Sequence, residues 1–256
     1  MSGSAETPVV PADYYRAIFE VDRSHWWHRG MLEITRALLG ARLARSGLRL
    51  LDVGCGTGGF LSWTREVASH ATLAGVDVSE EALRLAQTRL PGVDLRLAGA
   101  SSLPFEAGAF DLVVLNDVLQ HLREDDVEAS LLELQRMLAV GGALLVRTNG
   151  ARRAWRPSEE WRLYDGRTLA AELDRAGLRR ERLTHANVAG SLWAAARGRR
   201  PSPPSETSHG VPATGSSAGD GAKLRLLLLE ARYLSRPNRS LPYGHTMFAL
   251  ATATRP

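Results

Sequence analysis

The sequence holds a single cysteine, Cys55, among its 256 residues. One thiol forms neither an internal disulfide nor a multi-cysteine metal site, so the sequence excludes both. No uninterrupted apolar stretch approaches the roughly 20 residues that a membrane-spanning helix needs. The opening MSGSAETPVV also lacks the basic segment and apolar run of a secretory signal. These absences predict a cytoplasmic protein without stable membrane insertion.

Lysine is almost absent as well, since Lys223 is the only one. The net charge of +4 at pH 7 comes from arginines that are scattered among Asp and Glu along the chain. A nucleic-acid-binding protein gathers its basic residues into a stripe and adds aromatic rings that stack on bases. The sequence therefore predicts no nucleic-acid partner.

Strand and helix patterns alternate from residue 48 onward. The expected strands are 48–53, 71–78, 94–98, 111–115, 142–148, 177–184 and 245–252. The expected helices are 13–45, 58–67, one that Ser79 caps, 124–138, 167–176 and 224–234. Such alternation predicts a parallel α/β sheet with helices on both faces, and the continuous apolar runs suit strands that are buried on both sides.

Composition divides the chain into four parts. Residues 1–45 are expected to form an N-terminal helical lid, in which Ser24 caps a helix that begins at His25. Residues 46–198 form the core. The Pro/Ser/Gly/Thr tract 199–221 cannot pack and is expected to be a disordered linker. Residues 222–256 add a helix and a last strand to the same domain.

The stretch LLDVGCGTGGF, residues 50 to 60, carries the chemistry. Its glycines satisfy G-x-G-x-x-G through Gly54, Gly56 and Gly59, and G-x-G-x-G through Gly54, Gly56 and Gly58. A strand that ends in such a turn brings backbone close to a ligand. The spacing by itself leaves open a nicotinamide dinucleotide, with Asp77 on the ribose, and a different nucleoside ligand.

Polar residues follow several expected strands, at the edge where open α/β sheets bind ligands. They are Asp52, Asp77, Gly99 and Asn116. A dinucleotide pyrophosphate has no use for the carboxylate of Asp52, whereas a ligand with an α-ammonium group does. This favours the second ligand.

Together the motifs resemble the class I S-adenosylmethionine-dependent methyltransferases, over nearly the whole chain. The segments that carry the resemblance are Leu51–Gly58, Gly75–Val78, Ser102–Phe105, Phe110–Val114, Asp117–His121 and Met137–Gly142. Ser24–His28 and Leu241–Gly244 are similar to a narrower bacterial branch of natural-product and polysaccharide pathways. The resemblance implies a doubly wound, seven-stranded Rossmann-like sheet of order 3-2-1-4-5-7-6, with the last strand antiparallel.

The resemblance also assigns residues to S-adenosylmethionine and to its product S-adenosylhomocysteine. Gly54, Gly56 and Gly58 would form the floor under the methionine moiety, and Asp52 would serve its ammonium group. Asp77 would accept both ribose hydroxyls, since a carboxylate offers two acceptor oxygens. The remaining cofactor residues would be Val78, Gly99, Ala100, Ser101, Asn116 and Asp117. Many relatives carry Asp where this chain has Gly99, so adenine is expected to rely on Ala100, Ser101 or water.

Two histidines are candidate proton acceptors, because a near-neutral imidazole suits that role. His121 follows the fourth expected strand, and in many relatives this histidine is mainly structural. His25 belongs to the lid. Trp26 either closes over the sulfonium in a cation–π contact or only packs the lid helix. His25 and His28 alone are too few ligands for a metal site.

The sequence thus predicts an enzyme that transfers a methyl group to an O, N or C nucleophile of a small molecule in bacterial specialised metabolism. Aromatic residues in the lid and near Trp161, Trp193 and Tyr243 favour a small acceptor over a macromolecule. The segment 187–200 either packs over the acceptor or touches a membrane surface. The alternatives are a cofactor-binding pathway protein with another activity and an NAD(P)-dependent oxidoreductase. A monomer or a homodimer is expected.

Overall fold

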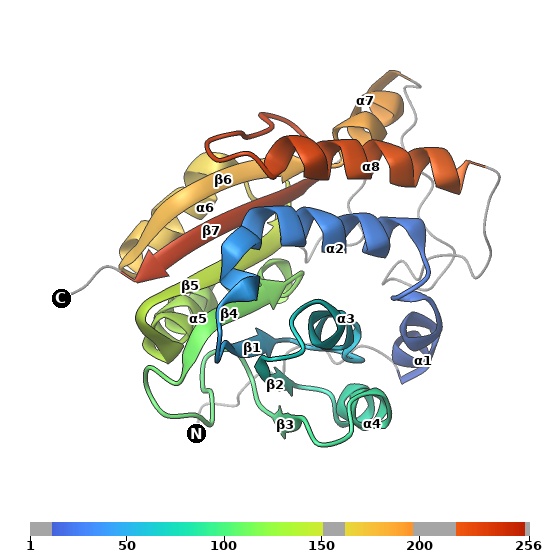
Figure 1. The fold of residues 1–256 in the computed structure, drawn as a ribbon. Helices are drawn as coiled ribbons and strands as arrows, with labels where there is room; N and C mark the ends of the chain where they lie inside the picture. The colour runs from blue at the N-terminus through green and yellow to red at the C-terminus, as the bar shows by residue number, and fades with distance from the viewer. Residues whose placement is uncertain (1–11, 151–161, 197–218, 254–256) are drawn as a thin grey trace.

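The computed structural model describes residues 12–150, 162–196 and 219–253. In this part of the chain, seven strands form one sheet of order β3-β2-β1-β4-β5-β7-β6 (Figure 1). Only the pairings of β7 with β5 and β6 are antiparallel. The predicted strand order and the antiparallel last strand are confirmed. The strands are β1 (Arg49–Val53), β2 (Thr72–Asp77), β3 (Asp94–Leu97), β4 (Phe110–Asn116), β5 (Leu138–Asn149), β6 (Leu178–Ala186) and β7 (Thr246–Ala253).

Helices cover both faces of the sheet. Residues of α2, α3 and α8 share one apolar cluster with one face, and residues of α5 and α6 share another with the opposite face. The helices are α1 (Ala12–Val21), α2 (Trp26–Leu39), α3 (Gly59–Val67), α4 (Glu80–Arg89), α5 (Glu124–Met137), α6 (Gly166–Arg175), α7 (Val188–Ala196) and α8 (Asp220–Leu234). Two short 3-10 helices, η1 (Gly40–Ala44) and η2 (Leu119–His121), complete the described elements.

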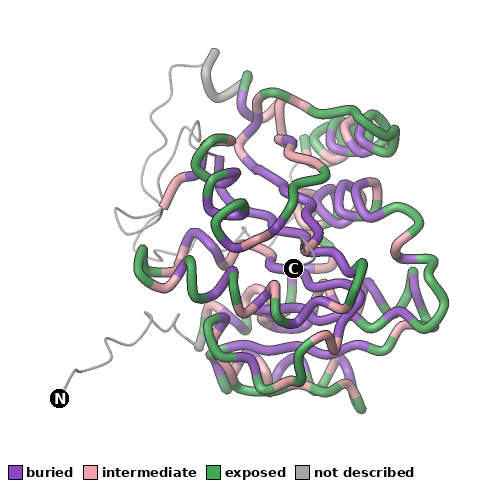
Figure 2. Tube along the Cα trace, turned by 90° about the vertical axis from the view of Figure 1, so that its left-hand side faces the viewer, coloured by how far each residue is buried: buried purple, intermediate pink, exposed green. Residues whose placement is uncertain are grey.

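The central strands are apolar on both sides because side chains alternate between the two layers. Leu51 and Val113 belong to the cluster under α5 and α6, whereas Leu50 and Leu112 belong to the cluster under α2, α3 and α8. All four are fully buried, and Figure 2 shows buried segments of the chain running through the middle of the molecule. This explains the continuous apolar runs in the sequence.

Three predicted boundaries are wrong. The helix expected over 13–45 breaks after Val21, and α2 begins at Trp26 rather than His25. His25 is the N-cap of α2, since its Nδ1 accepts the amide hydrogen of Trp27 at 3.4 Å, while the Ser24 hydroxyl bonds to the carbonyl of Val21. β5 begins at Leu138, directly after α5, instead of at residue 142.

α8 lies alongside α2 on the outer side of the sheet (Figure 1). It begins at Asp220, inside the linker expected over 199–221, most of which lies outside the described residues. Gly30 allows the close approach, because a Cβ there would lie 2.2 Å from Cδ1 of Leu227. Glu230 of α8 accepts the amide hydrogens of Asn187 and Val188 at 2.6 and 2.9 Å, which anchors the start of α7. Among the described helices, none is both long enough and apolar enough to cross a bilayer.

Candidate functional site

The predicted polar residues meet at one edge of the sheet. Asp52 lies between Gly75 of β2 and Val114 of β4, while β2 ends in Asp77 and β4 in Asn116. Several of these residues line a cavity of about 140 Å³ under α1 and α2. Its lining residues are Ile18, Asp22, His28, Leu32, Asp52, Gly54, Cys55, Gly56, Thr57, Gly59, Phe60, Asn116 and Arg147.

The turn after β1 requires glycine for two separate reasons. Gly54, Gly56 and Gly58 have φ of 73°, 53° and 76°, a left-handed region that side chains disfavour. A Cβ on Gly54 would also lie 2.2 Å from Cγ2 of Val118. Above Gly56 there is open space, since a Cβ there meets no described atom within 4 Å. The turn therefore offers bare backbone to a ligand that lies over Gly56.

Asp77 holds this turn in place. Its Oδ2 accepts the amide hydrogen of Gly56 at 2.8 Å, and its Oδ1 accepts that of Ser79 at 3.0 Å. Burial raises the pKa of Asp77, and these backbone donors lower it. Each carboxylate oxygen keeps a further lone pair, so the side chain can still accept two hydroxyl groups.

Three residues that line the cavity carry a buried side-chain oxygen without a partner among the described residues. Oδ1 of Asp22 belongs to a carboxylate whose other oxygen is already paired with Thr57 and Arg89, whereas Oδ1 of Asp52 and Oδ1 of Asn116 lie at the edge of the sheet. The pKa of Asp52 is raised to about 7, because burial, with a smaller contribution from the charge of Asp77, outweighs the lowering effect of Arg147. A buried carboxylate without a donor is costly, so this pair of acceptors fits a cationic or strongly donating ligand group.

The buried guanidinium of Arg147 lines the same cavity. Arg147 of β5 pairs with Asp117, the residue after Asn116, whose Oδ2 accepts from Nη2 at 2.6 Å and from Nε at 3.0 Å. Asp117 adopts φ of 56°, a strained conformation for this residue type. The guanidinium also lies 5.3 Å from the centre of the Trp27 ring.

The imidazole of His28 lines this cavity. Burial and, to a smaller extent, the positive charge of Arg147 lower its pKa to about 4, so the ring is neutral at pH 7. Its ring centroid lies 5.0 Å from that of Trp27 and 5.9 Å from that of His25. A neutral imidazole at this place can accept a hydrogen bond or a proton.

Helix α1 packs against the end of the sheet where β2 and β4 stop. Burial raises the pKa of Tyr15 to about 12, the charge of Asp77 raises it, and a hydrogen bond with Ser79 opposes both. Burial likewise raises the pKa of Tyr14 to about 12, with a contribution from Asp117. Both tyrosines therefore lie close to carboxylates of the predicted site.

The region expected to hold adenine has free room. A Cβ on Gly99 would meet only Cγ1 of Val78, at 3.9 Å, and the Val78 side chain is exposed. Ala100 is buried and Ser101 is exposed in the turn that follows β3. The missing carboxylate at position 99 thus leaves space rather than a clash.

Three other predicted residues lie outside the group that lines the cavity. His25 caps α2, and burial lowers its pKa while Asp220 raises it. Trp26 packs toward α8, where the amine of Lys223 lies 5.1 Å from its ring centre. His121 ends the short helix η2. The roles predicted for these residues stay predictions, and Trp161 and the side chain of Trp193 lie outside the described residues.

The site also contains residues that the sequence prediction did not assign to it. Arg147, His28 and Asp22 line the cavity. The sequence does indicate a role for Arg147, because a charged residue inside the apolar run of β5 needs a buried partner. His28 was visible only as a member of the Ser24–His28 motif. Within the described residues, no group of three or more His, Cys, Asp or Glu is placed to hold a metal ion.

Comparison with known proteins identifies the family. A family model described as "Methyltransferase domain" matches residues 51–146. A malonyl-acyl-carrier-protein O-methyltransferase of Enterobacter lignolyticus is 34% identical over 185 residues, which cover 68% of this chain and 72% of the relative. The chain belongs to the class I S-adenosylmethionine-dependent methyltransferases.

Other relatives match over a shorter stretch. A phthiotriol/phenolphthiotriol dimycocerosates methyltransferase of Mycobacterium ulcerans is 38% identical over 102 residues, 39% of this chain and 37% of its own. The match spans 32% to 41% of the length of the first four curated relatives. Among solved structures, the 4+2 cyclase SpnF shares the fold with a TM-score of 0.60, at 19% identity over 90% of this chain and 84% of its own.

The residues present fit the cofactor of this methyltransferase family, S-adenosylmethionine. Asp77 retains acceptor capacity for a ribose, and the turn over Gly56 is open. The unpartnered oxygens of Asp52 and Asn116 suit an ammonium group. Family membership also removes the NAD(P)-dependent oxidoreductase as an alternative.

Proposed function

We propose that the chain transfers a methyl group from S-adenosylmethionine to a small-molecule acceptor. The observation that carries the proposal is the charge pattern of the cavity, in which the orphaned carboxylate of Asp52 and the guanidinium of Arg147 line the same small space. An α-amino acid carries an ammonium and a carboxylate on one carbon, so it can meet both charges within one small cavity. A dinucleotide phosphate has no positive group for Asp52.

Each part of S-adenosylmethionine would bind to different residues of the site. Asp52 and Asn116 would accept from the ammonium group, and Arg147 would bind the carboxylate through Nη1, because Nε and Nη2 serve Asp117. Asp77 would accept from the ribose, and Gly99, Ala100 and Val78 would border the adenine. Within this proposal α1 and the start of α2 form a lid, as Tyr14 and Tyr15 lie near Asp117 and Asp77.

Catalysis in this arrangement rests on placement and on exclusion of water. S-adenosylmethionine supplies an electrophilic methyl group on a sulfonium, and the transfer needs an acceptor held in line with it. α1, α2 and Phe60 cover the cavity and lower the local dielectric. His28 is neutral there and would accept a hydrogen bond from a hydroxyl or amino group of the acceptor, which orients that group.

The names of two curated relatives, a dimycocerosates methyltransferase and a ubiquinone biosynthesis O-methyltransferase, support a small acceptor, while the malonyl group of a third is carried on an acyl-carrier protein. The identity of the acceptor and a place in specialised metabolism stay predictions. The fold is shared with a cyclase, SpnF, so cofactor binding without methyl transfer is the second candidate.

Two measurements test the proposal. Calorimetry is expected to show binding of S-adenosylmethionine and S-adenosylhomocysteine, and none of NADH. Incubation of the chain with methyl-labelled S-adenosylmethionine and a cell extract of the source organism should then label a small-molecule fraction, and Asp77→Ala should abolish the labelling. Label in protein or nucleic acid would contradict the acceptor class, and binding without any labelling would favour the second candidate.

A further inference from the structure

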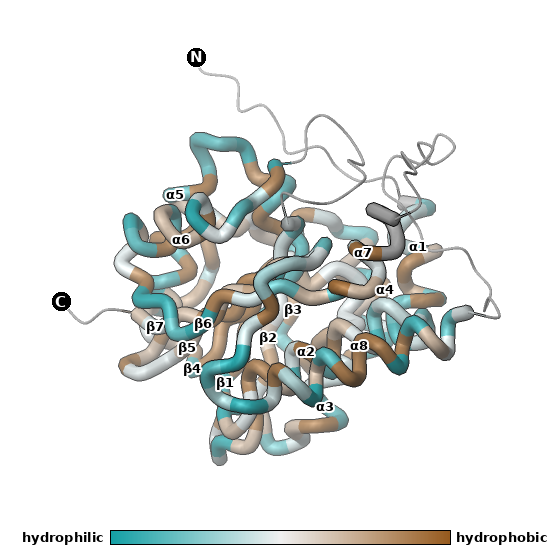
Figure 3. The backbone as a smooth tube through the Cα atoms, turned by 90° about the horizontal axis from the view of Figure 1, so that it is seen from above, coloured by the Kyte–Doolittle hydropathy of each residue, from teal (hydrophilic) through white to brown (hydrophobic). Residues whose placement is uncertain are grey.

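Exposed apolar side chains gather on α7 and α8. The described residues include ten large apolar side chains that are exposed, and five of them lie on these two helices. These are Leu192, Leu226, Leu228, Leu229 and Tyr233. Leu229 is 61% exposed, and Figure 3 shows strongly hydrophobic segments along α8. Large apolar patches on a surface mark a place that binds something.

Packing against the rest of the protein does not account for this surface. α8 already buries Leu227, Ala231 and Leu234 on its inner side, against α2 and the sheet. The exposed residues Leu226, Leu229 and Tyr233 recur at spacings of three and four, so they form a second stripe on the outer side. A surface helix that is apolar on two sides needs a second partner.

The charges around this stripe are positive. Arg225 and Arg232 are exposed on α8 and have no acidic partner among the described residues. The carboxylate of Glu230 is turned to the backbone of α7, and that of Asp220 pairs with Lys223 at 3.0 Å. Both acidic groups of α8 are therefore occupied, and of its basic groups Arg225 and Arg232 are available.

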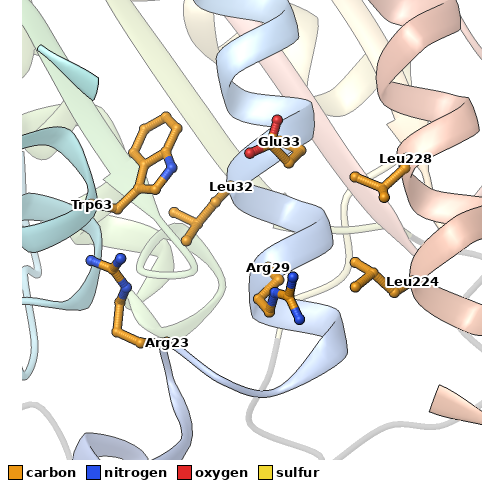
Figure 4. A pocket seen from close by; sticks show the side chains of 7 residues that line it. All are labelled: Arg23, Arg29, Leu32, Glu33, Trp63, Leu224 and Leu228. Carbon is orange, nitrogen blue, oxygen red and sulfur yellow. The ribbon is translucent and has the colours of Figure 1, made fainter. Parts of the chain in front are cut away.

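A groove beside the stripe combines the same two properties. It has a volume of about 220 Å³ and lies over α2, between α3 and α8 (Figure 4). Leu32, Trp63, Leu224 and Leu228 form its apolar wall. Arg23, Arg29 and Glu33 supply its charged groups. Arg23 is held by Glu66 at 2.7 Å, while Arg29 is exposed and free of an acidic partner in the described structure.

We infer that the outer face of α8, with Leu192 of α7, docks in the plane of an anionic lipid bilayer. Leu226, Leu229 and Tyr233 would enter the boundary between headgroups and acyl chains, and Arg225 and Arg232 would bind lipid phosphates, as in other interfacial amphipathic helices. Arg29 and the groove would receive a headgroup at the border of the contact.

Charge favours a lipid surface over a second copy of this chain. A two-fold interface places a patch against itself, so it would bring Arg225 and Arg232 close to the same arginines of the other copy.

Flotation of the full chain with lipid vesicles tests this inference without use of the cofactor. We expect binding to vesicles of mixed phosphatidylcholine and phosphatidylglycerol, little binding to phosphatidylcholine alone, and weaker binding at high salt. The double variant Leu226→Gln/Leu229→Gln should lower the bound fraction about tenfold or more. Arg225→Gln/Arg232→Gln should lower binding to the anionic vesicles alone.

Leu132→Gln is the matched control, because Leu132 of α5 is 45% exposed, as is Leu226, but lies on the opposite face of the sheet. It should bind vesicles as the unchanged chain does, and thermal unfolding should show that all variants fold. The inference is overturned if the unchanged chain ignores anionic vesicles, or if the leucine variant binds them equally well. It is also overturned if the leucine variant instead dissociates a dimer in sedimentation.

Discussion

The carboxylate of Asp22 accepts a hydrogen bond of 2.8 Å from the hydroxyl of Thr57, although the residues stand 35 positions apart. Asp22 lies between α1 and α2, and Thr57 lies in the glycine turn after β1. The same Oδ2 accepts from Nη1 of Arg89 at 2.7 Å, and Nη2 of Arg89 donates to the carbonyl of Phe19. One buried carboxylate thus ties the proposed lid to the turn it covers.

Asp22→Ala should lower the free energy of unfolding by about 3 to 5 kcal/mol, because it leaves the largely buried Arg89 without its counter-charge. Asp22→Asn keeps the shape and an acceptor for Thr57, so its loss should be smaller. Urea unfolding of the two variants beside the unchanged chain measures both effects. Equal stability of Asp22→Ala and the unchanged chain would show that this junction contributes nothing.

Asp77→Ala should weaken binding of S-adenosylhomocysteine by about 1.5 to 3 kcal/mol, since it removes the acceptor of both ribose hydroxyls. In a calorimeter this appears as a roughly tenfold to hundredfold higher Kd. Asp94→Ala, at the start of the adjacent strand β3, is the control and should bind normally. Unchanged affinity of Asp77→Ala would reject the assignment of the ribose.

Affinity for S-adenosylhomocysteine should depend on the protonation of Asp52. Its pKa in the empty protein is about 7, raised from 3.8 by burial, whereas an ammonium group binds the ionised form. Below pH 7 the Kd should therefore rise by up to about tenfold per pH unit, and above pH 7 it should level off. Asp52→Asn should bind weakly with no such dependence in calorimetry from pH 5.5 to 8.

The raised pKa of Asp52 also predicts how the stability of the cofactor-free protein depends on pH. This stability should fall as the pH rises, whereas the affinity for the cofactor should increase. The pKa of Asp52 is higher in the folded chain than in the unfolded chain. The contribution of Asp52 to the free energy of unfolding is therefore complete below pH 3.8 and is lost as the pH rises through 7. Without cofactor, Asp52→Asn should therefore unfold at higher urea concentration than the unchanged chain at pH 8. A lower midpoint would show that the carboxylate has a stabilising partner.

His28→Ala should lower kcat for a hydroxyl acceptor by roughly tenfold, because it removes the hydrogen bond that orients the acceptor. His25→Ala and His121→Ala test the two candidate proton acceptors, neither of which lines the cavity among the described residues, and a fall in kcat of about a hundredfold would identify the base. Cofactor affinity of each variant, measured separately, distinguishes catalysis from binding. If all three retain kcat, placement alone carries the reaction.

Gly30→Ala should destabilise the packing of α2 on α8 by about 1 to 3 kcal/mol, despite the better helix propensity of alanine. The added carbon would lie 2.7 Å from Cβ of Leu227 as well as 2.2 Å from Cδ1, so the helices must separate. Leu227→Ala in the same chain should recover part of the loss, which a double-mutant cycle of unfolding free energies detects. Strictly additive losses would contradict the close contact.

The sequence is most informative where one local pattern determines the structure. All seven predicted strands are present, although β3 and β6 contain few apolar residues. The prediction of Ser79 as a cap is confirmed, since its hydroxyl accepts the amide hydrogen of Ala82. The glycine turn and Asp77 also meet as predicted, because the motif lies within one β-α-β unit. Parallel strands place their carboxyl ends at the same edge, so the location of the site follows as well.

Contacts between distant segments escape prediction. The hydrogen bond between Asp22 and Thr57 and the pairing of Arg147 with Asp117 depend on how α1, α2 and β5 pack. The sequence places the cap of α2 one residue too early, because Ser24 is the better capping residue by type but bonds to Val21 instead. Periodicity also says little about the outer side of α8, because its four consecutive leucines, 226–229, place apolar side chains on every side of the helix.

The insertion of β7 between β5 and β6 has a consequence for the order in which the protein folds. During synthesis β6 leaves the ribosome about sixty residues before β7, and in the described sheet its hydrogen-bonding partner is β7. The half of the sheet that carries the glycine turn, β1 to β4, can pair as soon as it emerges. β6 must wait with an open edge, which is a template for unwanted pairing between nascent chains.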